Sequence, residues 1–329
     1  MEDEETMMRD HETGIGVSSS KIILIGEHSV VYGKPAIALP VPAVHAVTQT
    51  TRCLGPLRLQ CSFYNGILND GTDQIAGLRT VIPAALHVLK RPEKDVTITI
   101  NSAIPAARGM GSSAAVAISV VRSLFNYFET PLERNVLLNL VGVSEKYFHG
   151  NPSGLDAAAA SSTHPIFFMK GKGMEWIHHK LRGCLVIADS GIKGQTKRAV
   201  TALKQRLLQS ALLRRKVNQL GVLTSSARDA LETAKEEALG SILLDAHLLL
   251  QELGVSHPSL DYLVATAMKD GAIGAKMTGG GCGGCMIALV KDVRKAHDLA
   301  NKLMGAGAAK TWIQPLQGRN LPVNAGFLD

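Results

Sequence analysis

The segment from Ile104 to Val116 has the composition best suited to binding an anion. It reads Ile-Pro-Ala-Ala-Arg-Gly-Met-Gly-Ser-Ser-Ala-Ala-Val and leads into an unbroken helix-forming run to about Phe128. Glycines before a helix let backbone N–H groups turn toward an anion, and the helix N-terminus adds partial positive charge. Ser112 and Ser113 place hydroxyl groups where a phosphate or its metal ion would lie. The segment predicts a phosphate-binding loop, and taken alone it fits a tightly packed structural turn equally well.

This loop differs from the common Walker A loop. A Walker A loop follows the pattern G-x-x-x-x-G-K-[ST], in which a lysine comes after the last glycine. Here Gly111 is followed directly by Ser112. Any phosphate site at this position must therefore use another design.

Two carboxylates lie where a helix and a sharp turn would present them. A helix is predicted from Pro131 to about His149, because proline favours the first helical position, and this helix carries Glu145. The segment Gly150-Asn-Pro-Ser-Gly-Leu-Asp156 breaks that helix and puts Asp156 at the start of a short helical turn. A helix N-terminus stabilises an ionised carboxylate there, and a simple N-cap is the alternative interpretation. From its spacing alone, Glu145 is also compatible with an exposed helix position.

The elements that would position these groups mix strands and helices in both halves of the chain. Strands are predicted over 21–25, 36–39, 44–51, 61–68, 96–100, 184–188 and 311–313, and a Gly-rich turn at 278–284 enters another strand. Helices are predicted over 77–89, 112–128, 131–149, 195–221, 224–237, 238–253, 259–270 and 292–305, with a start near Ile82 as an alternative for the first because of Pro83. No strict β-α-β repeat is present, so we expect an α+β fold rather than a doubly wound sheet.

Three separate motifs rich in glycine and small residues together resemble those of the GHMP kinase superfamily. Residues 105–115 match its P-x-x-x-G-[LM]-G-S-S-A-A loop almost letter for letter. The segments Lys21 to Ala36, His149 to Asp156 and Ala188 to Thr196 resemble the mevalonate kinase family within it, in a bacterial-like form. The resemblance covers roughly residues 14 to 315. It implies a two-domain fold with a ribosomal-protein-like N-terminal half, a ferredoxin-like C-terminal half and an active site between them.

The resemblance also implies a reaction, in which the γ-phosphoryl group of ATP moves to the primary hydroxyl of mevalonate. Ser113, with Ser112 as a second candidate, and Glu145 would bind Mg²⁺. Asp156 would act as general base or orient the hydroxyl, and Lys21 would keep Asp156 charged and stabilise charge on the reacting oxygen or phosphoryl group. The residues expected to bind ATP are Pro105, Arg108, Gly109, Met110, Gly111, Ser112, Ser113 and Ala114. Those expected to bind mevalonate are Glu27, His28, Asp156, Thr278, Gly279 and Gly280.

The implied domain organisation has four parts. Residues 1–13 would form a mobile leader, 14–172 the N-terminal ATP-binding domain, 173–315 the C-terminal domain and 316–329 a tail. The sequence departs from the family at Cys282, where bacterial relatives often have Arg and others Gly. Contacts that depend on a charge at that position therefore do not carry over to this chain.

Composition limits the partners of this chain. With 46% hydrophobic and 19% charged residues it is expected to be a packed globular protein, and the formal net charge of +7 favours anionic ligands. Aromatic residues make up only 4%, without a stacking stripe for nucleic acid, and no apolar run approaches the roughly 18 residues of a membrane span. The basic stretch 193–216 fits an anion site or, more simply, a solvated helix face. We expect no nucleic acid or membrane partner, and by the resemblance a homodimer.

The five cysteines and the absence of a secretory n-region favour a reducing cytoplasm. Cys282-Gly-Gly-Cys285 has redox or metal spacing, but zinc would need two further ligands.

Two alternatives to the implied function stay open. One is another GHMP kinase acting on phosphomevalonate, galactose or homoserine, and the other is a non-catalytic ATP-binding relative. The presence of Lys21, Glu145 and Asp156 together disfavours the second, because a binding module needs no base.

Overall fold

The computed structural model describes residues 12–149 and 154–316. Apart from Glu12, Thr13 and Leu316, the leader and the tail expected from the sequence lie outside the described residues. Among the described helices, none is both long enough and apolar enough to cross a bilayer.

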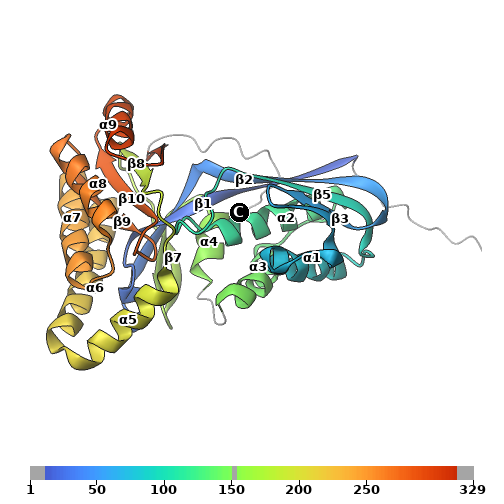
Figure 1. Cartoon of the computed structure of the whole chain (residues 1–329), viewed down its shortest axis with the longest axis horizontal. Helices are drawn as coiled ribbons and strands as arrows, with labels where there is room; N and C mark the ends of the chain where they lie inside the picture. The colour runs from blue at the N-terminus through green and yellow to red at the C-terminus, as the bar shows by residue number, and fades with distance from the viewer. Residues whose placement is uncertain (1–11, 150–153, 317–329) are drawn as a thin grey trace, which may run out of the picture. The chain divides into compact units, whose positions relative to one another are not determined.

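The chain divides into two compact units, each assembled from separate stretches (Figure 1). Unit 1 contains the described residues of 1–20, 45–104 and 112–161, and unit 2 contains those of 21–44, 105–111 and 162–329. The strands β1 (Thr13–Ile25) and β2 (Ala36–Pro56) each contribute residues to both units. The boundary predicted at residue 172 divides the sequence into two contiguous domains, whereas each unit is a group of separate stretches that pack together. The boundary therefore stays a prediction.

In unit 1, β2 pairs with β5, β5 with β3 and β3 with β4. The register of β2 and β5 runs from Ala46 opposite Ser102 to Arg52 opposite Val96. Along β5 every second residue is apolar, and Val96, Ile98 and Ile100 are buried, as the alternation predicts. The bounds of these strands are β3 (Arg58–Cys61), β4 (Tyr64–Ile67) and β5 (Lys94–Ser102).

Helices cover one face of this sheet (Figure 1). They are α1 (Ala76–Val88), α2 (Ser112–Tyr127), α3 (Arg134–His149) and α4 (Leu155–Ser161). Buried hydroxyl groups join sheet to helix, with Thr48 2.7 Å from Ser119 and Thr50 2.9 Å from Ser123. Each hydroxyl thereby satisfies the other away from water. The helix predicted after the Gly-rich loop is confirmed, and it positions the residues that follow the loop.

Unit 2 is built on a four-stranded antiparallel sheet with the strand order β11-β8-β10-β9. Its strands are β8 (Cys184–Asp189), β9 (Gly274–Thr278), β10 (Cys285–Val290) and β11 (Lys310–Pro315). Every residue of β8, β9 and β10 is buried, because helices pack against this sheet. The helices α7 (Glu236–Glu252) and α8 (Pro258–Lys269) contact β9, and α9 (Val293–Gly305) contacts β8 and β11.

Several predictions of local structure are wrong. The strand expected over 61–68 is the hairpin of β3 and β4, and the strands expected over 36–39 and 44–51 are one strand, β2. The helix expected over 224–237 is not separate, because the preceding helix continues to Glu232. The single helix expected over 195–221 is two helices, α5 (Thr196–Gln209) and α6 (Ala211–Glu232), because Ser210 leaves the helical conformation and its hydroxyl caps α6 through the N–H of Leu213 at 3.3 Å. A hairpin in which the Gly-rich stretch 170–173 joins the strands β6 (Ile166–Met169) and β7 (Gly173–Trp176) was also not predicted from the sequence. In unit 2 this hairpin extends the first part of β2, with Ala36 opposite Phe168.

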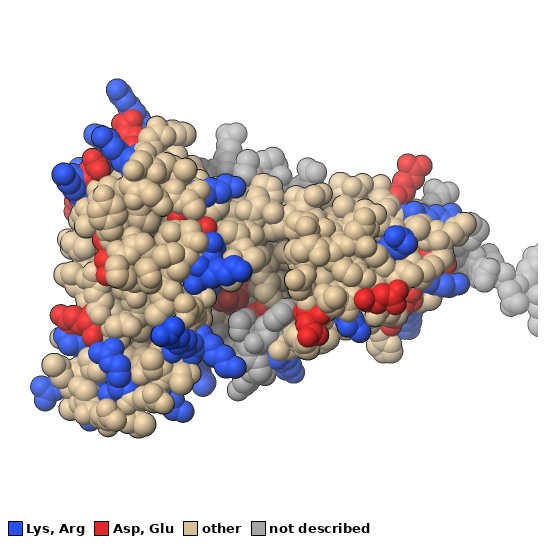
Figure 2. All heavy atoms as spheres, viewed as in Figure 1, with Lys and Arg blue, Asp and Glu red and all other residues tan. Residues whose placement is uncertain are grey.

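The basic stretch 193–216 lies on α5, α6 and the segment before them (Figure 2). Several of its cations bind groups of their own unit. Arg206 donates to the carbonyl of Leu253 at 2.8 Å, Arg214 donates to that of Leu207 at 2.6 Å, and Lys216 pairs with Glu252. These contacts support the interpretation of the stretch as a helix surface.

Candidate active site

Of the predicted phosphate loop, 105–115, residues 105–111 belong to unit 2 and the rest forms the first turn of α2. The backbone N–H of Lys21 donates to the carbonyl of Met110 at 3.1 Å. Gly111 has a φ of 70°, and a Cβ there would lie 2.8 Å from Cγ of Lys21. A side chain at Gly111 would therefore be strained and would collide with the lysine stem. The glycine lets the buried Lys21 lie against the loop.

Arg108 anchors this loop to the end of β8. Its Nε lies 2.9 Å from the carboxylate of Asp189, and its Nη2 donates to the carbonyl of Gly191 at 2.9 Å. The N–H of Gly194 also donates to the carbonyl of Ala107 at 3.0 Å. The guanidinium expected to bind ATP thus has a structural partner, and its buried Nη1 has none among the residues that the structure describes.

The third glycine-rich motif, 278–284, lies against the first two within unit 2. The hydroxyl of Thr278 donates to the carbonyl of Ile23 at 2.8 Å and accepts from the N–H of Ile23 at 3.1 Å. A Cβ on Gly109 would lie 3.2 Å from Cα of Gly279, so the two backbones approach closely. The structure therefore brings together, around β1, three motifs that are far apart in the sequence.

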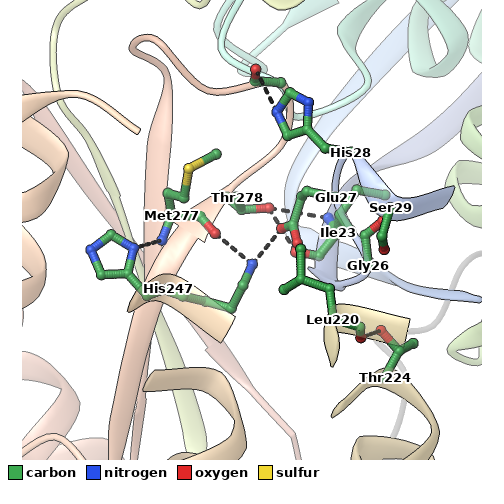
Figure 3. Close-up of polar contacts among 12 residues, drawn as sticks. Ile23, Gly26, Glu27, His28, Ser29, Leu220, Thr224, His247, Met277 and Thr278 are labelled. Carbon is green, nitrogen blue, oxygen red and sulfur yellow. Dashed lines mark hydrogen bonds and ion pairs between the residues drawn. The ribbon is translucent and has the colours of Figure 1, made fainter. Parts of the chain in front are cut away.

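Glu27 and His28 lie in the turn between β1 and the 3-10 segment η1 (Ser29–Tyr32). Both side chains are buried, and Glu27 forms an ion pair with the fully buried Lys276 (Figure 3). Burial raises the pKa of the Glu27 carboxyl and lowers that of the Lys276 ammonium, and the attraction between them opposes both shifts. The pair connects β9 to the turn after β1 within unit 2.

His28 is held neutral by its surroundings. Its Nε2 lies 3.1 Å from the carbonyl of Gly280, so Nε2 carries the proton and donates (Figure 3). Burial lowers the pKa of His28 to about 4. Its Nδ1 is buried without a hydrogen-bond partner in the described structure, and in this tautomer it is an acceptor. The residue has a φ of 59°, a conformation uncommon outside glycine, which aims the ring toward the 278–284 loop.

Unit 1 holds the remaining predicted residues. Ser113, at the second position of α2, donates to a carboxylate oxygen of Glu145 on α3 at 2.9 Å. Glu145 is buried, although the sequence alone was compatible with an exposed position. Two oxygen ligands thus lie together at the start of a helix, which fits a hard cation such as Mg²⁺. In the described chain, no cluster of three or more His, Cys, Asp or Glu residues offers a further metal site.

Asp156 lies in the first turn of α4 and is partly exposed. The preceding Gly154 has a φ of 76°, and its carbonyl accepts from the N–H of Ala158 at 3.0 Å. The sharp turn predicted before Asp156 is therefore confirmed at Gly154, while residues 150–153 lie outside the described residues.

Lys276 is the polar residue of this region that sequence reasoning missed. It is the single charged residue of β9, Gly-Ala-Lys-Met-Thr, in which every position is buried. A lysine within a fully buried strand requires an acidic partner, because an unpaired buried charge is very costly. That requirement was the available signal, but the sequence does not identify Glu27, 249 residues away, as the partner.

The structure gives the two cysteines of the Gly-rich turn into β10 different surroundings, with Cys285 buried and Cys282 partly exposed. Both Cys282 and Cys285 are free thiols. Burial raises the pKa of the Cys285 thiol well above its usual range, which favours the protonated thiol. The Cys-Gly-Gly-Cys spacing follows from the Gly-rich turn into β10.

Comparison with known proteins agrees with this arrangement. Residues 79–164 match the GHMP kinases N terminal domain, and residues 199–309 match the GHMP kinases C terminal domain. A mevalonate kinase of Thermococcus sibiricus is 31% identical over 307 residues, which cover 87% of this chain and 92% of that protein. One of Pyrococcus furiosus is 30% identical over 315 residues, covering 89% and 93%.

Solved structures show the same fold. Mevalonate kinase from methicillin-resistant Staphylococcus aureus is 31% identical with a TM-score of 0.74, covering 94% of this chain and 100% of that one. The L. major mevalonate kinase in complex with R-mevalonate has a TM-score of 0.81 at 23% identity, covering 95% of this chain and 100% of that one. The expected α+β, two-domain GHMP kinase fold is confirmed. The chain belongs to the mevalonate kinase family of the GHMP kinases.

Proposed function

We propose that this chain transfers the γ-phosphoryl group of ATP to the primary hydroxyl of mevalonate, giving 5-phosphomevalonate and ADP. The observation that carries the proposal is the hydrogen bond between Ser113 and Glu145 at the end of the phosphate loop. An anion-binding helix start with a carboxylate beside it suits a nucleotide that arrives with a divalent cation. The relatives at 30% and 31% identity are mevalonate kinases, which supports mevalonate as the acceptor.

The loop and the first turn of α2 would bind the phosphates of ATP through backbone N–H groups. Ser113 and Glu145 would hold Mg²⁺, with Ser112 as a second hydroxyl. A metal ion held by these residues would supply positive charge to offset that of the phosphate oxygens. Arg108 would act mainly by keeping the loop in place, because its guanidinium is bound to Asp189 and Gly191.

Asp156 and Lys21 would act on the reacting hydroxyl. Asp156 would accept the hydroxyl proton or orient the oxygen for attack, and orientation carries much of the effect in loose phosphoryl-transfer transition states. The Lys21 ammonium would stabilise the negative charge that develops on the transferred group.

Glu27 and His28, with Thr278, Gly279 and Gly280, would bind mevalonate. A neutral His28 offers an acceptor at Nδ1, so it suits a substrate hydroxyl rather than a carboxylate. The free carboxylate oxygen of Glu27 is a second acceptor on the neighbouring residue. Two unpartnered acceptors on consecutive residues would suit a substrate that carries more than one hydroxyl group.

A coupled ADP-release assay over a panel of acceptors tests this function. With Mg²⁺ and ATP, we expect turnover with mevalonate and little with phosphomevalonate, galactose or homoserine. Turnover with another acceptor alone would identify a different GHMP kinase. ATP binding without turnover on any acceptor would identify a non-catalytic relative.

We also propose that the chain works in the cytoplasm as a homodimer. Its five cysteines suit a reducing compartment. Light scattering should give twice the 35.0 kDa of one chain. A mass of 35.0 kDa at micromolar concentration would contradict the dimer.

A further inference from the structure

The ion pair between Glu27 and Lys276 leaves one oxygen of the carboxylate unused. The Lys276 ammonium contacts Oε1 of Glu27 and the carbonyl of Met277 (Figure 3). The other oxygen, Oε2, is buried and has no partner in the described structure. An unsatisfied buried acceptor is costly, so a ligand that donates to Oε2 would gain a strong hydrogen bond.

A second unpartnered acceptor lies on the next residue. Nδ1 of His28 is buried and free of hydrogen bonds, while Nε2 is used by Gly280. Glu27 and His28 are 4% and 6% exposed, so neither acceptor is satisfied by bulk water. Two buried acceptors on consecutive residues indicate a ligand that brings hydroxyl donors.

Lys276 is itself fixed from the opposite side of β9. The N–H of the adjacent Met277 donates to Nδ1 of His247 on α7 at 3.3 Å (Figure 3). Nε2 of His247 lies 3.4 Å from a carboxylate oxygen of Asp261 on α8. Ser256 donates to the same carboxylate at 2.5 Å. The backbone next to Lys276 is thus bound by His247 of α7, and Asp261 of α8 lies beside that imidazole.

We propose that Lys276 is a positioning residue for the acceptor alcohol. Its ammonium holds Glu27 by Oε1 and favours the ionised carboxylate, so that Oε2 accepts a hydrogen bond from a substrate hydroxyl. Lys276 itself does not contact the substrate. This inference rests on the proposed function, because the alcohol is the substrate of that reaction.

A purely structural role is the alternative. Buried ion pairs contribute little net stability, because desolvation offsets attraction, but removing one partner leaves a costly unpaired charge. A structural role would therefore appear as a lower Tm with unchanged substrate affinity. A positioning role would raise the KM for the alcohol and leave the KM for ATP in place.

The variant Lys276→Met distinguishes the positioning role from the structural role. Without the ammonium, buried Glu27 takes up a proton and becomes a donor instead of an acceptor. We expect the KM for mevalonate to rise roughly tenfold or more, the loss typical of a hydrogen bond to a charged group, with the KM for ATP within about twofold of wild type. The matched control is Leu303→Ala, a fully buried change in α9, which should lower Tm and leave both KM values unchanged.

A double variant keeps the test valid if Lys276→Met alone does not fold. Lys276→Met/Glu27→Gln has no unpaired buried charge and should keep a Tm near that of wild type. Because Lys276 acts through Glu27, adding Lys276→Met to Glu27→Gln should change the KM for mevalonate by no more than about twofold. A multiplicative loss in the double variant would overturn the inference.

Wild-type turnover tests the proposed function, and the KM values of Lys276→Met test the positioning role separately. No turnover of mevalonate by wild type would defeat the proposed function. Wild-type turnover together with an unchanged KM for mevalonate in Lys276→Met would defeat the positioning role alone. A rise in the KM for both substrates, matched by Leu303→Ala, would assign Lys276 to stability only.

Discussion

Asp156 is the residue on which the proposed chemistry depends most directly. Asp156→Asn keeps the shape of the side chain and removes its basicity. We expect kcat to fall by roughly 10²–10⁴, the usual contribution of a positioned acid or base. ATP affinity should stay near that of wild type, because the residue acts on the alcohol. Steady-state kinetics and ATP titration measure the two effects separately.

The size of the loss separates two roles for Asp156. A drop in kcat at the lower end of this range would favour orientation of the hydroxyl over proton removal. Near-normal kcat would show that Asp156 has neither role.

Ser113 is expected to bind the metal ion together with Glu145, to which it donates at 2.9 Å. Ser113→Ala removes one of the two oxygens and should shift the Mg²⁺ titration of activity to higher concentration. Ser112→Ala is the matched control, one residue away, and should shift it less. If the two variants give the same Mg²⁺ titration as wild type, Ser113 is not a ligand.

At this scale the sequence identified types of residue better than their partners. The hydroxyls of the loop and the carboxylates of 145 and 156 could be named from motifs. The partner of Arg108, Asp189, is 81 residues away, and no spacing rule connects them. Lys276 was not predicted as a site residue because the motif is defined by its glycines. A charged residue in an apolar strand nevertheless requires a partner.

Helix α7 and strand β9 approach so closely that only glycine fits between them. A Cβ on Gly240 would lie 2.4 Å from the carbonyl oxygen of Ile273. Gly240→Ala should lower the free energy of unfolding by about 1–3 kcal/mol, because backbone has to move to make room. Chemical denaturation at neutral pH measures this change in the free energy of unfolding.

Gly142 provides the control for that substitution. It also lies inside a helix, α3, but a Cβ there would meet nothing within 4 Å. Gly142→Ala should therefore raise the free energy of unfolding by about 0.5–1 kcal/mol through helix propensity. Equal effects at the two positions would contradict the close approach of α7 and β9.

Periodicity predicted the elements well where one face of a helix is buried, and poorly where a break depends on one residue. The helix after the loop was predicted over 112–128 and is observed as Ser112–Tyr127. The break at Ser210 was missed, because both flanking segments have helical composition and only the cap of α6 separates them. The β6–β7 hairpin was missed, because short strands leave little periodic signal.

The whole molecule should lose stability below neutral pH because of two buried histidines. Burial lowers the pKa of His28 and of His247 to about 4 from the ordinary value of 6.5. Between these values the unfolded chain binds more protons than the folded one, so stability is full above pH 6.5 and is lost as pH falls toward 4. From pH 7 to pH 5 the loss is on the order of 2 kcal/mol for each histidine.

His247→Asn tests this pH dependence, because the amide oxygen can still accept from the N–H of Met277 while the titrating ring is gone. Urea unfolding at pH 7 and pH 5 should show a loss for the variant that is smaller by about 2 kcal/mol than for wild type. Wild-type stability that stays flat over this range, or an unchanged slope in the variant, would contradict the burial of neutral imidazoles.

At the scale of the whole chain, composition indicated a packed α+β protein that favours anions, with a formal net charge of +7. It did not indicate how the chain is distributed over two units, because three stretches of each unit are separated in sequence. The loop 105–111 belongs to one unit and the helix that it starts belongs to the other. That division depends on tertiary packing, which periodicity does not report.

Phosphorus NMR of the product tests most directly whether the chain transfers phosphate to the primary hydroxyl of mevalonate. With ATP, Mg²⁺ and mevalonate, we expect one phosphomonoester signal split by the two protons of the terminal methylene, formed in equal amount to ADP. ADP without a new ester would show an ATPase. An ester on the tertiary hydroxyl, or none with mevalonate, would contradict the proposed function.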